Sequence, residues 1–587
     1  MIAELKRRKV FKVGVAYLVV GWLLIQIAAT VAPQLNLPEW APRLITFVIL
    51  LGFPVAILLA WVVDLSPDGI KIVGAPLGNK RIFATVAVLV ALAVGWYWKG
   101  QPALQGEGSA ARSIAVLPFA NMSGDPANEY FSDGISEEIL NVLARTPELQ
   151  VAARTSSFSF KGKTEDIPQI ARALKVRMVL EGSVRKQGDR IRITAQLIDA
   201  KSGFHAWSQT YDRKLADIFA IQDEIARAIG DELKVRIVGA EEGGAVSAGT
   251  MNLEAHDLYL RGLALWQRRR EAELWQAIDQ FERAAAADPK FAQAYAGQAL
   301  VYVVLPDYSA RISYAEAFAR ARDNAERALG LDATLPEPYA VLASLADNER
   351  RRATSESLYQ RAITLRPSFA TAYQWFGNSM MSAGKLGPGL ASLEHASVLD
   401  PRSLIIATNR AWILITLGRY ADAKAVCEPI LEFAPKYAGC LEMTGLADLL
   451  LGDLDSARSM LDQYSSAFNP SAHAQVNELI NAMQGHGDRH AIASQLASSG
   501  LQSASDPTSG NVFLPNSIPM LLVLLGEQQM ALAYLEKIAN ENSSDLTSWA
   551  VMPLALAQVR CDPRFVALVK QLKTTDPHYA KVCGGQH

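Results

Sequence analysis

Proline residues recur at a fixed interval of 34 residues in the second half of this 587-residue chain. Pro367, Pro401 and Pro435 stand in the phrases LRP, LDP and FAP, and Asn469 before Pro470 continues the count. A period of this length with a terminal proline is typical of stacked helix pairs, because one pair alone cannot bury its apolar face. This region is therefore predicted to form a helical solenoid.

The residue types within the period resemble the tetratricopeptide repeat. The repeat that ends at Pro401 carries aromatic, apolar or small residues at the expected sites, namely Tyr373, Phe376, Gly377, Gly389, Leu393 and Ala396. The second repeat is longer than the period, and the surplus falls in LPDYSARISY between its helices. We predict six repeats over residues 252–470. Degenerate helical repeats and a cap with a polar outer face are predicted for residues 471–587.

The first helix of each repeat is expected to line a concave groove. The residues that the repeat pattern assigns to this groove are Arg268, Asp347, Gln374, Asn378, Trp412, Ile415, Leu446 and Leu449. The surface changes from polar to apolar towards the C-terminus, so Trp412→Ala is expected to weaken partner binding without unfolding the chain. Alternatively, the C-terminal segment covers the last four of these residues. Chaperone-adaptor members of the family clamp a peptide carboxylate with lysines and asparagines, and only Asn378 matches here, which excludes that ligand class.

Three apolar stretches occupy the first hundred residues, at about 11–32, 44–63 and 82–98. A bilayer core about 30 Å thick needs roughly 20 apolar residues of helix, so the first two are long enough and the third is marginal. A cleaved signal peptide is the alternative for the first stretch. Its apolar run exceeds the usual length, however, and Pro33 directly follows the one small-residue cleavage pattern. Three transmembrane helices are therefore predicted within residues 1–100.

Basic residues set the predicted orientation of these helices. The N-terminal tail and the loop after the second stretch are rich in lysine and arginine, whereas the loop between the first two holds only Arg43. The tail and the second loop are therefore expected in the cytoplasm. Three crossings then place the residues after about 100 in the periplasm, with the anchor in a bacterial inner membrane.

Residues 112–238 carry the alternation of strand and helix patterns that predicts an α/β domain. The expected elements are a strand at 113–119, a helix from 135 opened by Ser132 and Asp133, a short strand near 150, a loop at 154–163, a helix at 165–175, a hairpin over 177–199 turning at Gly188-Asp189, a strand from 204, and a helix at 217–236. The hairpin is the clearest of these, because apolar and polar residues alternate strictly along its second strand.

Several stretches of this domain, among them LPFANMSGDPANEYFSDGISEEIL and ALKVRMVLEGSVRKQGDRIRITAQLIDAKSGFHAWSQTYDR, resemble the FlgO-like, TolB-amino-terminal-like family of bacterial envelope domains. The resemblance implies a mixed sheet flanked by helices. In relatives, a signalling module often precedes this domain and tetratricopeptide repeats follow it. Here the apolar stretches precede the domain instead, so no signalling output is carried over.

Motifs for enzyme chemistry are missing from the sequence: we find no nucleophile elbow, P-loop, zinc-protease motif or dinucleotide fingerprint. His486 and His490 stand four apart, but Gly485 and Gly487 favour an exposed turn over a metal site. The basic stripe at 185–192 is interpreted as the solvated face of the hairpin, and Asp133-Gly134 as a helix N-cap. The formal net charge of −2 gives no reason to expect nucleic acid as a partner. A non-catalytic protein without a cofactor or metal is predicted.

Four cysteines occur, and two pairings are conceivable. Cys427 and Cys440 lie in adjacent helices, and the connection through Pro435 can bring their Cα atoms within the roughly 5.5–6 Å that a disulfide prefers. Alternatively, Cys427 is a small apolar core residue of its repeat. Cys561 and Cys583 form the second conceivable pair, and both questions stay open at this point.

Taken together, these patterns predict a multi-domain chain with N-terminal transmembrane α-helices, an α/β mixed-sheet domain and an all-α solenoid. The expected function is an inner-membrane-anchored periplasmic scaffold that binds protein or peptide partners of the bacterial cell envelope. The alternative is a transmembrane sensor whose α/β domain binds a ligand and signals to a cytoplasmic partner.

Overall fold

The computed structural model describes residues 17, 20, 21, 24, 63–66, 69–72, 112–146, 148–233, 249–465, 470–505, 516–541, 556 and 558–571. The predicted membrane spans at 11–32, 44–63 and 82–98 lie outside these residues, apart from four helical positions in the first and the last residue of the second. Among the residues that can be described, no helix is both long and apolar enough to cross a membrane.

Two compact units make up the chain, residues 1–106 and residues 107–587. In the first unit, β1 (Val63–Ser66) pairs antiparallel with β2 (Gly69–Ile72), with Val63 opposite Ile72. Apart from the helical positions 17, 20, 21 and 24, the remainder of the described fold belongs to the second unit.

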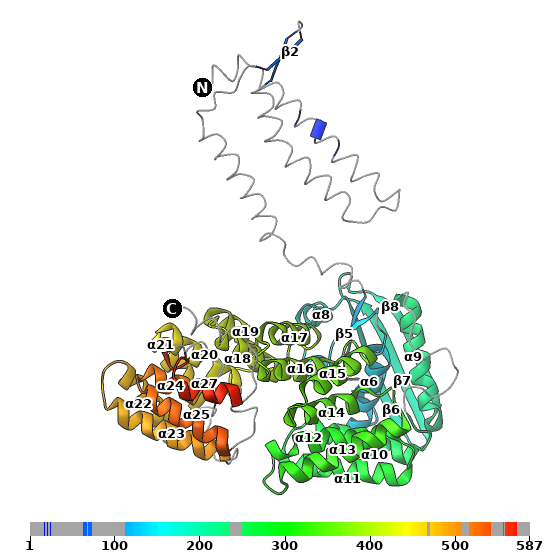
Figure 1. Cartoon of the computed structure of the whole chain (residues 1–587). Helices are drawn as coiled ribbons and strands as arrows, with labels where there is room; N and C mark the ends of the chain where they lie inside the picture. The colour runs from blue at the N-terminus through cyan, green and yellow to red at the C-terminus, as the bar shows by residue number, and fades with distance from the viewer. Residues whose placement is uncertain are drawn as a thin grey trace. The chain divides into compact units, whose positions relative to one another are not determined.

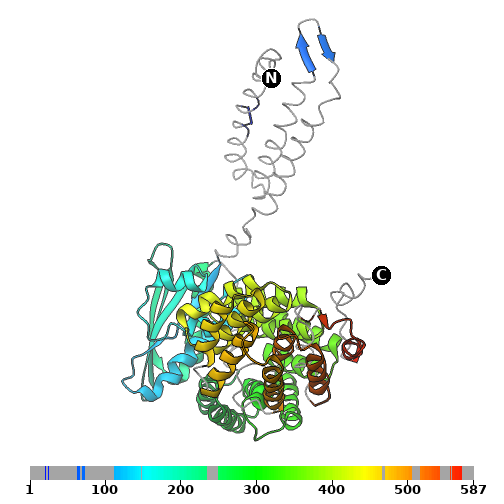
Figure 2. The same cartoon turned by 90° about the vertical axis from the view of Figure 1, so that its left-hand side faces the viewer.

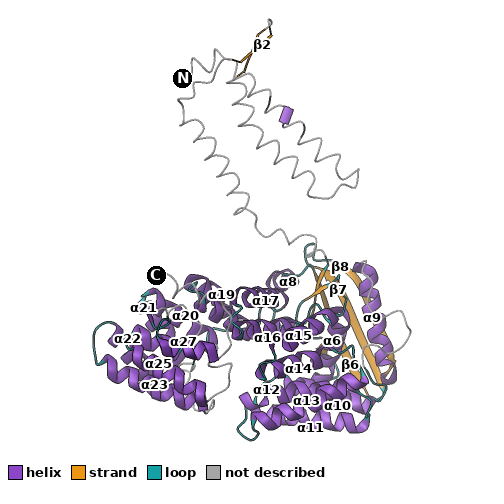
Figure 3. Cartoon of the chain, viewed as in Figure 1, coloured by secondary structure: helices purple, strands orange, loops and turns teal. Residues whose placement is uncertain are grey.

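A six-stranded mixed sheet opens the second unit (Figure 3). Its strands are β3 (Ser113–Val116), β4 (Ala120–Asn121), β5 (Gln150–Val151), β6 (Met178–Gln187), β7 (Arg190–Asp199) and β8 (His205–Lys214). The strand order is β5-β3-β6-β7-β8, with β4 beside β6. β3 runs parallel to β5 and β6, whereas β6, β7 and β8 are antiparallel. The predicted mixed sheet is confirmed.

The sequence alternation of the predicted hairpin decides which face of β7 is buried. Ile191, Ile193, Ala195 and Leu197 are fully buried, and the polar residues between them point to the other face. Gly188 has a positive φ of 61°, which a glycine adopts without steric cost in a tight turn. The apolar face packs with the long helices of the same module in one core.

The helices of the α/β module are α6 (Glu129–Ala144), α7 (Arg154–Phe158), α8 (Ile167–Leu174) and α9 (Ile218–Leu233), with 3-10 turns η1 (Pro126–Asn128) and η2 (Leu215–Asp217). Two expectations were wrong here. Helix α6 begins at Glu129 rather than after Asp133, because the turn η1 leads directly into it. Residues 154–158 form a helix instead of a loop, and contacts with the solenoid hold this segment in place, as described below.

Six helix pairs form the solenoid that follows (Figure 1). The first helices of the pairs are α10 (Leu253–Trp266), α12 (Ala292–Val304), α14 (Pro336–Asn348), α16 (Ala370–Ser382), α18 (Leu404–Thr416) and α20 (Ala438–Leu451). The second helices are α11 (Glu271–Ala287), α13 (Tyr314–Leu331), α15 (Arg352–Leu365), α17 (Leu386–Leu399), α19 (Tyr420–Phe433) and α21 (Leu454–Ser465). The predicted tetratricopeptide-type solenoid is therefore confirmed as a fold.

The prolines of the repeat lie just after the second helices, and Gly377 lies where the two helices of a pair approach each other. Pro367, Pro401 and Pro435 each follow the second helix of a pair by two residues, where a proline stops the helix from continuing. A Cβ atom on Gly377 would lie 2.7 Å from Cγ of Leu393, so only glycine lets these two helices approach. The surplus of the second repeat contains the 3-10 turn η3 (Leu305–Asp307).

Further helices continue after the sixth pair, namely α22 (Pro470–Met483), α23 (Arg489–Ser505), α24 (Ile518–Leu524), α25 (Gln528–Glu541) and α27 (Pro563–Gln571). The predicted extra pair appears as α24 and α25. Ser517, just before α24, donates a hydrogen bond of 3.5 Å to Glu442 of α20, and both side chains are buried. The C-terminal segment therefore folds back against the first helix of the sixth pair.

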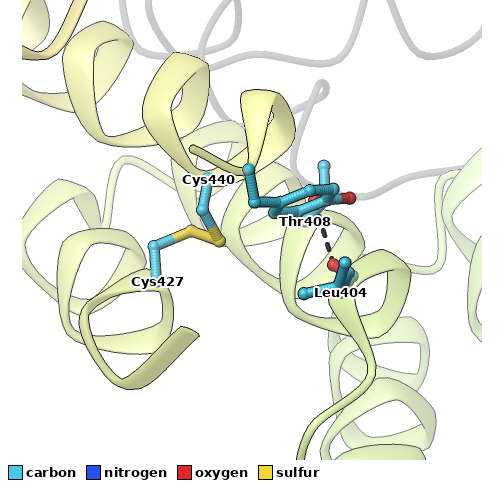
Figure 4. The surroundings of a disulfide bond; sticks show 5 residues. Leu404, Thr408, Cys427 and Cys440 are labelled. Carbon is cyan, nitrogen blue, oxygen red and sulfur yellow. Dashed lines mark hydrogen bonds between the residues drawn. A yellow bond between two sulfur atoms is a disulfide. The ribbon is translucent and has the colours of Figure 1, made fainter. Parts of the chain in front are cut away.

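A disulfide joins α19 to α20 (Figure 4). The Cα atoms of Cys427 and Cys440 are 5.2 Å apart, and both residues are fully buried. Beside the bridge, Thr408 donates to the carbonyl of Leu404 at 3.1 Å. Of the two alternatives for Cys427, the structure shows the bridge. The second conceivable pair includes Cys583, which lies outside the described residues.

Candidate binding site

Helix α6 of the α/β module packs against α10, the first helix of the first pair (Figure 1). Figure 2 shows the α/β module beside the repeats from a second direction. Gly134 marks the closest approach, because a Cβ atom there would lie 2.7 Å from Cδ2 of Leu260 on α10. A larger side chain at this position would push the helices apart. The inner face of the first repeats is thus already in contact with a helix of the same chain.

A buried polar cluster fixes α6 on α10. His256 Nε2 of α10 lies 2.7 Å from Glu138 Oε1 of α6, and Gln222 of α9 donates to the other oxygen of the same carboxylate. All three side chains are buried. The ring of Phe219 meets the His256 ring edge-on at 4.8 Å. Because a buried carboxylate is stable only when its oxygens have partners, this cluster requires one relative placement of the three helices.

A second contact lies near the start of α6. Tyr130 donates a hydrogen bond of 2.5 Å to Asp257, and Arg261 donates one of 3.0 Å to the Tyr130 oxygen. Burial, followed by the hydrogen bond to Asp257, raises the pKa of Tyr130 to about 12. The phenol therefore stays protonated and remains a donor at neutral pH.

The third contact connects α7 with the turn between α17 and α18. The backbone amide of Ala153 donates to the Leu399 carbonyl at 2.7 Å, and Ser156 Oγ donates to Asp400 at 2.5 Å. The amide of Arg402 donates to the same hydroxyl at 2.8 Å. Burial raises the pKa of Asp400 to about 6, although hydrogen bonds to its carboxylate oppose this. The α/β module is therefore attached to the solenoid at its first repeat and again after its fourth.

A cavity of about 210 Å³ remains between these contacts. Its walls come from α6 and α7 on one side and from α10, α12, α14 and the turn before α16 on the other. Its charged lining residues are Glu137, Glu138, Arg145, Arg154, Arg269, Glu337, Arg366 and Asp400. Among the described residues, no cluster of three or more histidine, cysteine or acidic side chains could hold a metal ion.

Two ion pairs are formed by residues that line this cavity. Arg154 Nε lies 2.7 Å from Glu137, and Arg366 lies 2.6 Å from Glu337. Burial raises the pKa of Glu137, and Arg154 counteracts this rise. Burial lowers the pKa of Arg145, and the positive charge of Arg366 lowers it further. The positive charges of Arg145 and Arg366 in this cavity thus act on each other.

The apolar end of the predicted groove is not an open surface. Trp412 is 3%, Ile415 0%, Leu446 0% and Leu449 2% exposed, and all four belong to one apolar core with residues of the C-terminal helices. Of the two alternatives for these four residues, their burial agrees with coverage by the chain itself, and binding of a partner in the groove stays a prediction. The physical reason for this coverage is that a large apolar face is more stable when the chain's own C-terminal segment packs on it.

The other predicted groove residues differ in accessibility. Asp347 and Gln374 are buried, and Asp347 forms an ion pair with Arg352. Asn378 is half-buried, and Arg268 is exposed in the turn that ends α10. Whether any of these residues contacts a partner stays a prediction.

Sequence reasoning missed the residues that form the junction. Glu137 and Glu138 lie in the helix predicted from residue 135 but were not singled out, and His256, Ser156 and Asp400 carried no motif. No local spacing could have found the contacts between the two modules, since His256 and Glu138 are 118 residues apart and Ser156 and Asp400 are 244 apart.

The structure also tests the interpretations of the basic stripe at 185–192 and of Asp133 as a helix N-cap. Arg190 and Arg192 of the basic stripe both form ion pairs with Asp212 of β8 and are exposed. Asp133 is not a helix N-cap but lies within α6, where it pairs with Lys161 at 2.6 Å.

The fold defines a solenoid of the tetratricopeptide type with an α/β module docked on its inner face. The family model for the second domain of HilA/YgeH-like transcriptional regulators matches residues 109–228, which contain nearly all of the α/β module. This match covers a minor part of the chain. The resemblance to FlgO-like, TolB-amino-terminal-like domains stays a prediction.

Two relatives are similar over parts of the chain. "Putative adenylate cyclase 3" of Rhizobium meliloti (strain 1021) is 42% identical over 236 residues, which is 40% of this chain and 40% of the relative. The Hsp70-Hsp90 organizing protein of Triticum aestivum is 33% identical over 95 residues, 16% of each protein. The chain therefore spans less than half of either relative.

Two solved structures are similar to this chain at low sequence identity. Yeast Tom70 is 15% identical with a TM-score of 0.32, and the match covers 85% of this chain and 90% of that one. PilF of Pseudomonas aeruginosa is 15% identical with a TM-score of 0.27, covering 44% of this chain and 96% of that one.

Proposed function

We propose that this chain is a non-catalytic scaffold, anchored in the bacterial inner membrane, whose periplasmic solenoid binds protein or peptide partners. The observation that carries the proposal is the contact between α6 and the solenoid. The inner face accepts a helix through complementary polar contacts such as Glu138 with His256, at 2.7 Å. A face of stacked helix pairs that binds one helix in this way has the shape and the chemistry to bind others.

The proposed location has two independent supports. The three apolar stretches of the first hundred residues have the composition of membrane spans, and their flanking charges orient the rest of the chain outward. The disulfide between Cys427 and Cys440 agrees with an oxidising compartment, because disulfides are rare in the cytosol. Together they favour the periplasm over the cytoplasm.

Enzyme activity is not part of the proposal. The adenylate cyclase in the comparison extends well beyond the matched region, since only 40% of it aligns with this chain. The sequence carries no nucleotide-binding or nucleophile motif that would supply such an activity here.

Site-specific photo-crosslinking tests the scaffold function. A photoreactive amino acid replaces Arg268, which is exposed beside the inner face, in the full chain expressed in a Gram-negative host. The matched control places the same amino acid at Arg283, which is exposed on α11, a second helix. We expect one discrete adduct from position 268 and none of the same mass from position 283. Mass spectrometry then identifies the partner.

Two results would contradict the scaffold function. One is the lack of any protein adduct at position 268 in cells grown under several conditions. The other is the same adduct from both positions, because this would show contact without selectivity for the inner face.

A second candidate function is the transmembrane sensor. The cavity between the α/β module and the solenoid favours it, because residues of both modules line that cavity. A ligand there would contact both modules and so change the stability of their junction. A cytoplasmic adduct, captured from a photoreactive residue in the segment 64–81, would favour the sensor over the scaffold.

A further inference from the structure

Four arginines line the cavity between the α/β module and the solenoid: Arg145, Arg154, Arg269 and Arg366. They come from four separate segments of the chain. Buried guanidinium groups are costly unless a negative group compensates each of them. The carboxylates of the same cavity must therefore be assigned before any excess of positive charge is inferred.

The four cavity carboxylates already have protein partners. Glu137 pairs with Arg154 at 2.7 Å, and Glu337 pairs with Arg366 at 2.6 Å. Glu138 accepts from Gln222 and contacts His256, and Asp400 accepts from Ser156 at 2.5 Å. These contacts leave no carboxylate for Arg145.

Arg145 forms no ion pair with a described carboxylate, although the negative charges of Glu337 and Asp332 act on it, whereas Arg269 has a hydrogen bond with Tyr308. Its Nε is buried, and no described residue accepts a hydrogen bond from it. The positive charge of Arg366 acts on Arg145, and Glu337, whose negative charge also acts on Arg145, is already paired with Arg366. The Nε of Arg366 is likewise buried without an acceptor among the described residues. Two guanidinium groups of this cavity therefore have a buried Nε–H group without an acceptor among the described residues.

We propose that this cavity binds a small organic anion, whose carboxylate or phosphate oxygens accept hydrogen bonds from Arg145 and Arg366. The planar fork of a guanidinium group matches either oxyanion. One oxyanion between the two cations would remove their repulsion and provide acceptors for both buried Nε–H groups. This inference goes beyond the scaffold function and does not depend on it.

The other lining residues and the cavity volume indicate the size and polarity of the rest of the ligand. Tyr259, Trp266 and Phe369 contribute aromatic surface to the same cavity. Its volume of about 210 Å³ is below the roughly 300–1,000 Å³ of sites for drug-sized ligands. The site therefore fits a compact anion with one apolar or aromatic group and excludes a peptide.

Calorimetric titration of the purified full chain in detergent tests this site. The probes are sodium benzoate and sodium phosphate, each added at constant ionic strength maintained with chloride. At least one probe is expected to bind, and Arg145→Gln is expected to weaken that binding about tenfold or more, as for the loss of one charge-assisted hydrogen bond. Benzoate binding alone would identify a carboxylate ligand, and phosphate binding alone a phosphorylated one.

Control variants separate binding from folding. Arg283→Gln, on the exposed face of α11, should leave the affinity unchanged. Without an anion, Arg145→Gln should melt at the same temperature as the wild type or higher, because it removes a repulsion, whereas a structural arginine would lower the melting temperature. If Arg145→Gln does not fold, Arg145→Lys should fold and bind more weakly, since lysine lacks the guanidinium fork. The proposal is overturned if neither probe binds, or if the Arg145 variants bind as well as the wild type.

Discussion

Asp400 shows how one buried carboxyl group links two modules. It accepts from Ser156 of α7 while it lies in the turn between α17 and α18. Its pKa of about 6 lies above the 3.9 of an exposed aspartate, because burial disfavours the charged form. The folded state therefore binds a proton more tightly than the unfolded state does. This contribution to stability is fully present below about pH 4 and is lost as the pH rises through about 6.

Asp400→Asn tests this linkage. The amide cannot ionise, so the variant should gain unfolding free energy relative to the wild type as the pH rises from 4 to 7. The relative gain is about 2–3 kcal/mol, which corresponds to a shift of roughly two pKa units. Urea unfolding at several pH values measures it. Asp422→Asn, at an exposed site on α19, should show no such pH-dependent gain. A pH-independent difference between Asp400→Asn and the wild type would refute the assigned cause.

Trp412 was assigned to the groove by the repeat pattern, but its side chain is buried in the structure. Because its side chain is buried in the core of the later repeats, Trp412→Ala should now destabilise the chain by about 3–5 kcal/mol. Denaturant unfolding measures this loss. Ile405→Ala on the same helix is the matched control, since Ile405 is 50% exposed and should cost less than about 1 kcal/mol. Equal unfolding midpoints for Trp412→Ala and the wild type would restore the open-groove interpretation.

At the scale of elements, a disulfide connects two successive helices of the solenoid, α19 and α20. The disulfide between α19 and α20 closes a loop of 13 residues within one turn of the solenoid. The chain-entropy model gives about 3 kcal/mol for a loop of this size, because the bridge restricts the unfolded chain. Stability of the fifth and sixth pairs is thus expected to depend on the redox state.

Removal of this bridge gives a quantitative prediction. The double variant Cys427→Ala, Cys440→Ala should lose about 3 kcal/mol of unfolding free energy, partly through the unfolded state. A reductant should lower the stability of the wild type by more than that of the variant, because Cys561 is disulfide-bonded in both. Thiol titration of the denatured, unreduced chain provides the control. Detection of free thiols at both positions in protein isolated from the periplasm would contradict the bridge and weaken the proposed location.

At the scale of the whole molecule, the proposed topology puts the solenoid on the far side of the membrane. Alkaline phosphatase is active only outside the cytoplasm, so fusions after residue 112 should be active in a Gram-negative host. Fusions after Lys71 should be inactive, because the basic loop is predicted to be cytoplasmic. Immunoblots for equal fusion levels are the control. The reverse pattern would place the repeats in the cytoplasm.

The sequence determined those features that repeat locally. Prolines every 34 residues specified the helix pairs, and the alternation of Ile191, Ile193 and Leu197 specified the hairpin and its buried face. Both signals arise from the geometry of a single helix or strand, which places every third or fourth residue, or every second residue, on one side. Such signals survive in the sequence because each element must bury its own face.

Only the tertiary structure decided what covers those faces and which polar groups meet. The helix at 154–158, the burial of Trp412 and the cavity beside Arg145 all depend on segments that are distant in the chain. Ser156 and Asp400, for instance, are 244 residues apart. Which segment covers an apolar face follows from the complementarity of two surfaces, and the periodicity of one surface does not encode the position of the other. For this reason the solenoid and the α/β module could each be predicted from the sequence, whereas the docking of the module on the inner face of the solenoid could not.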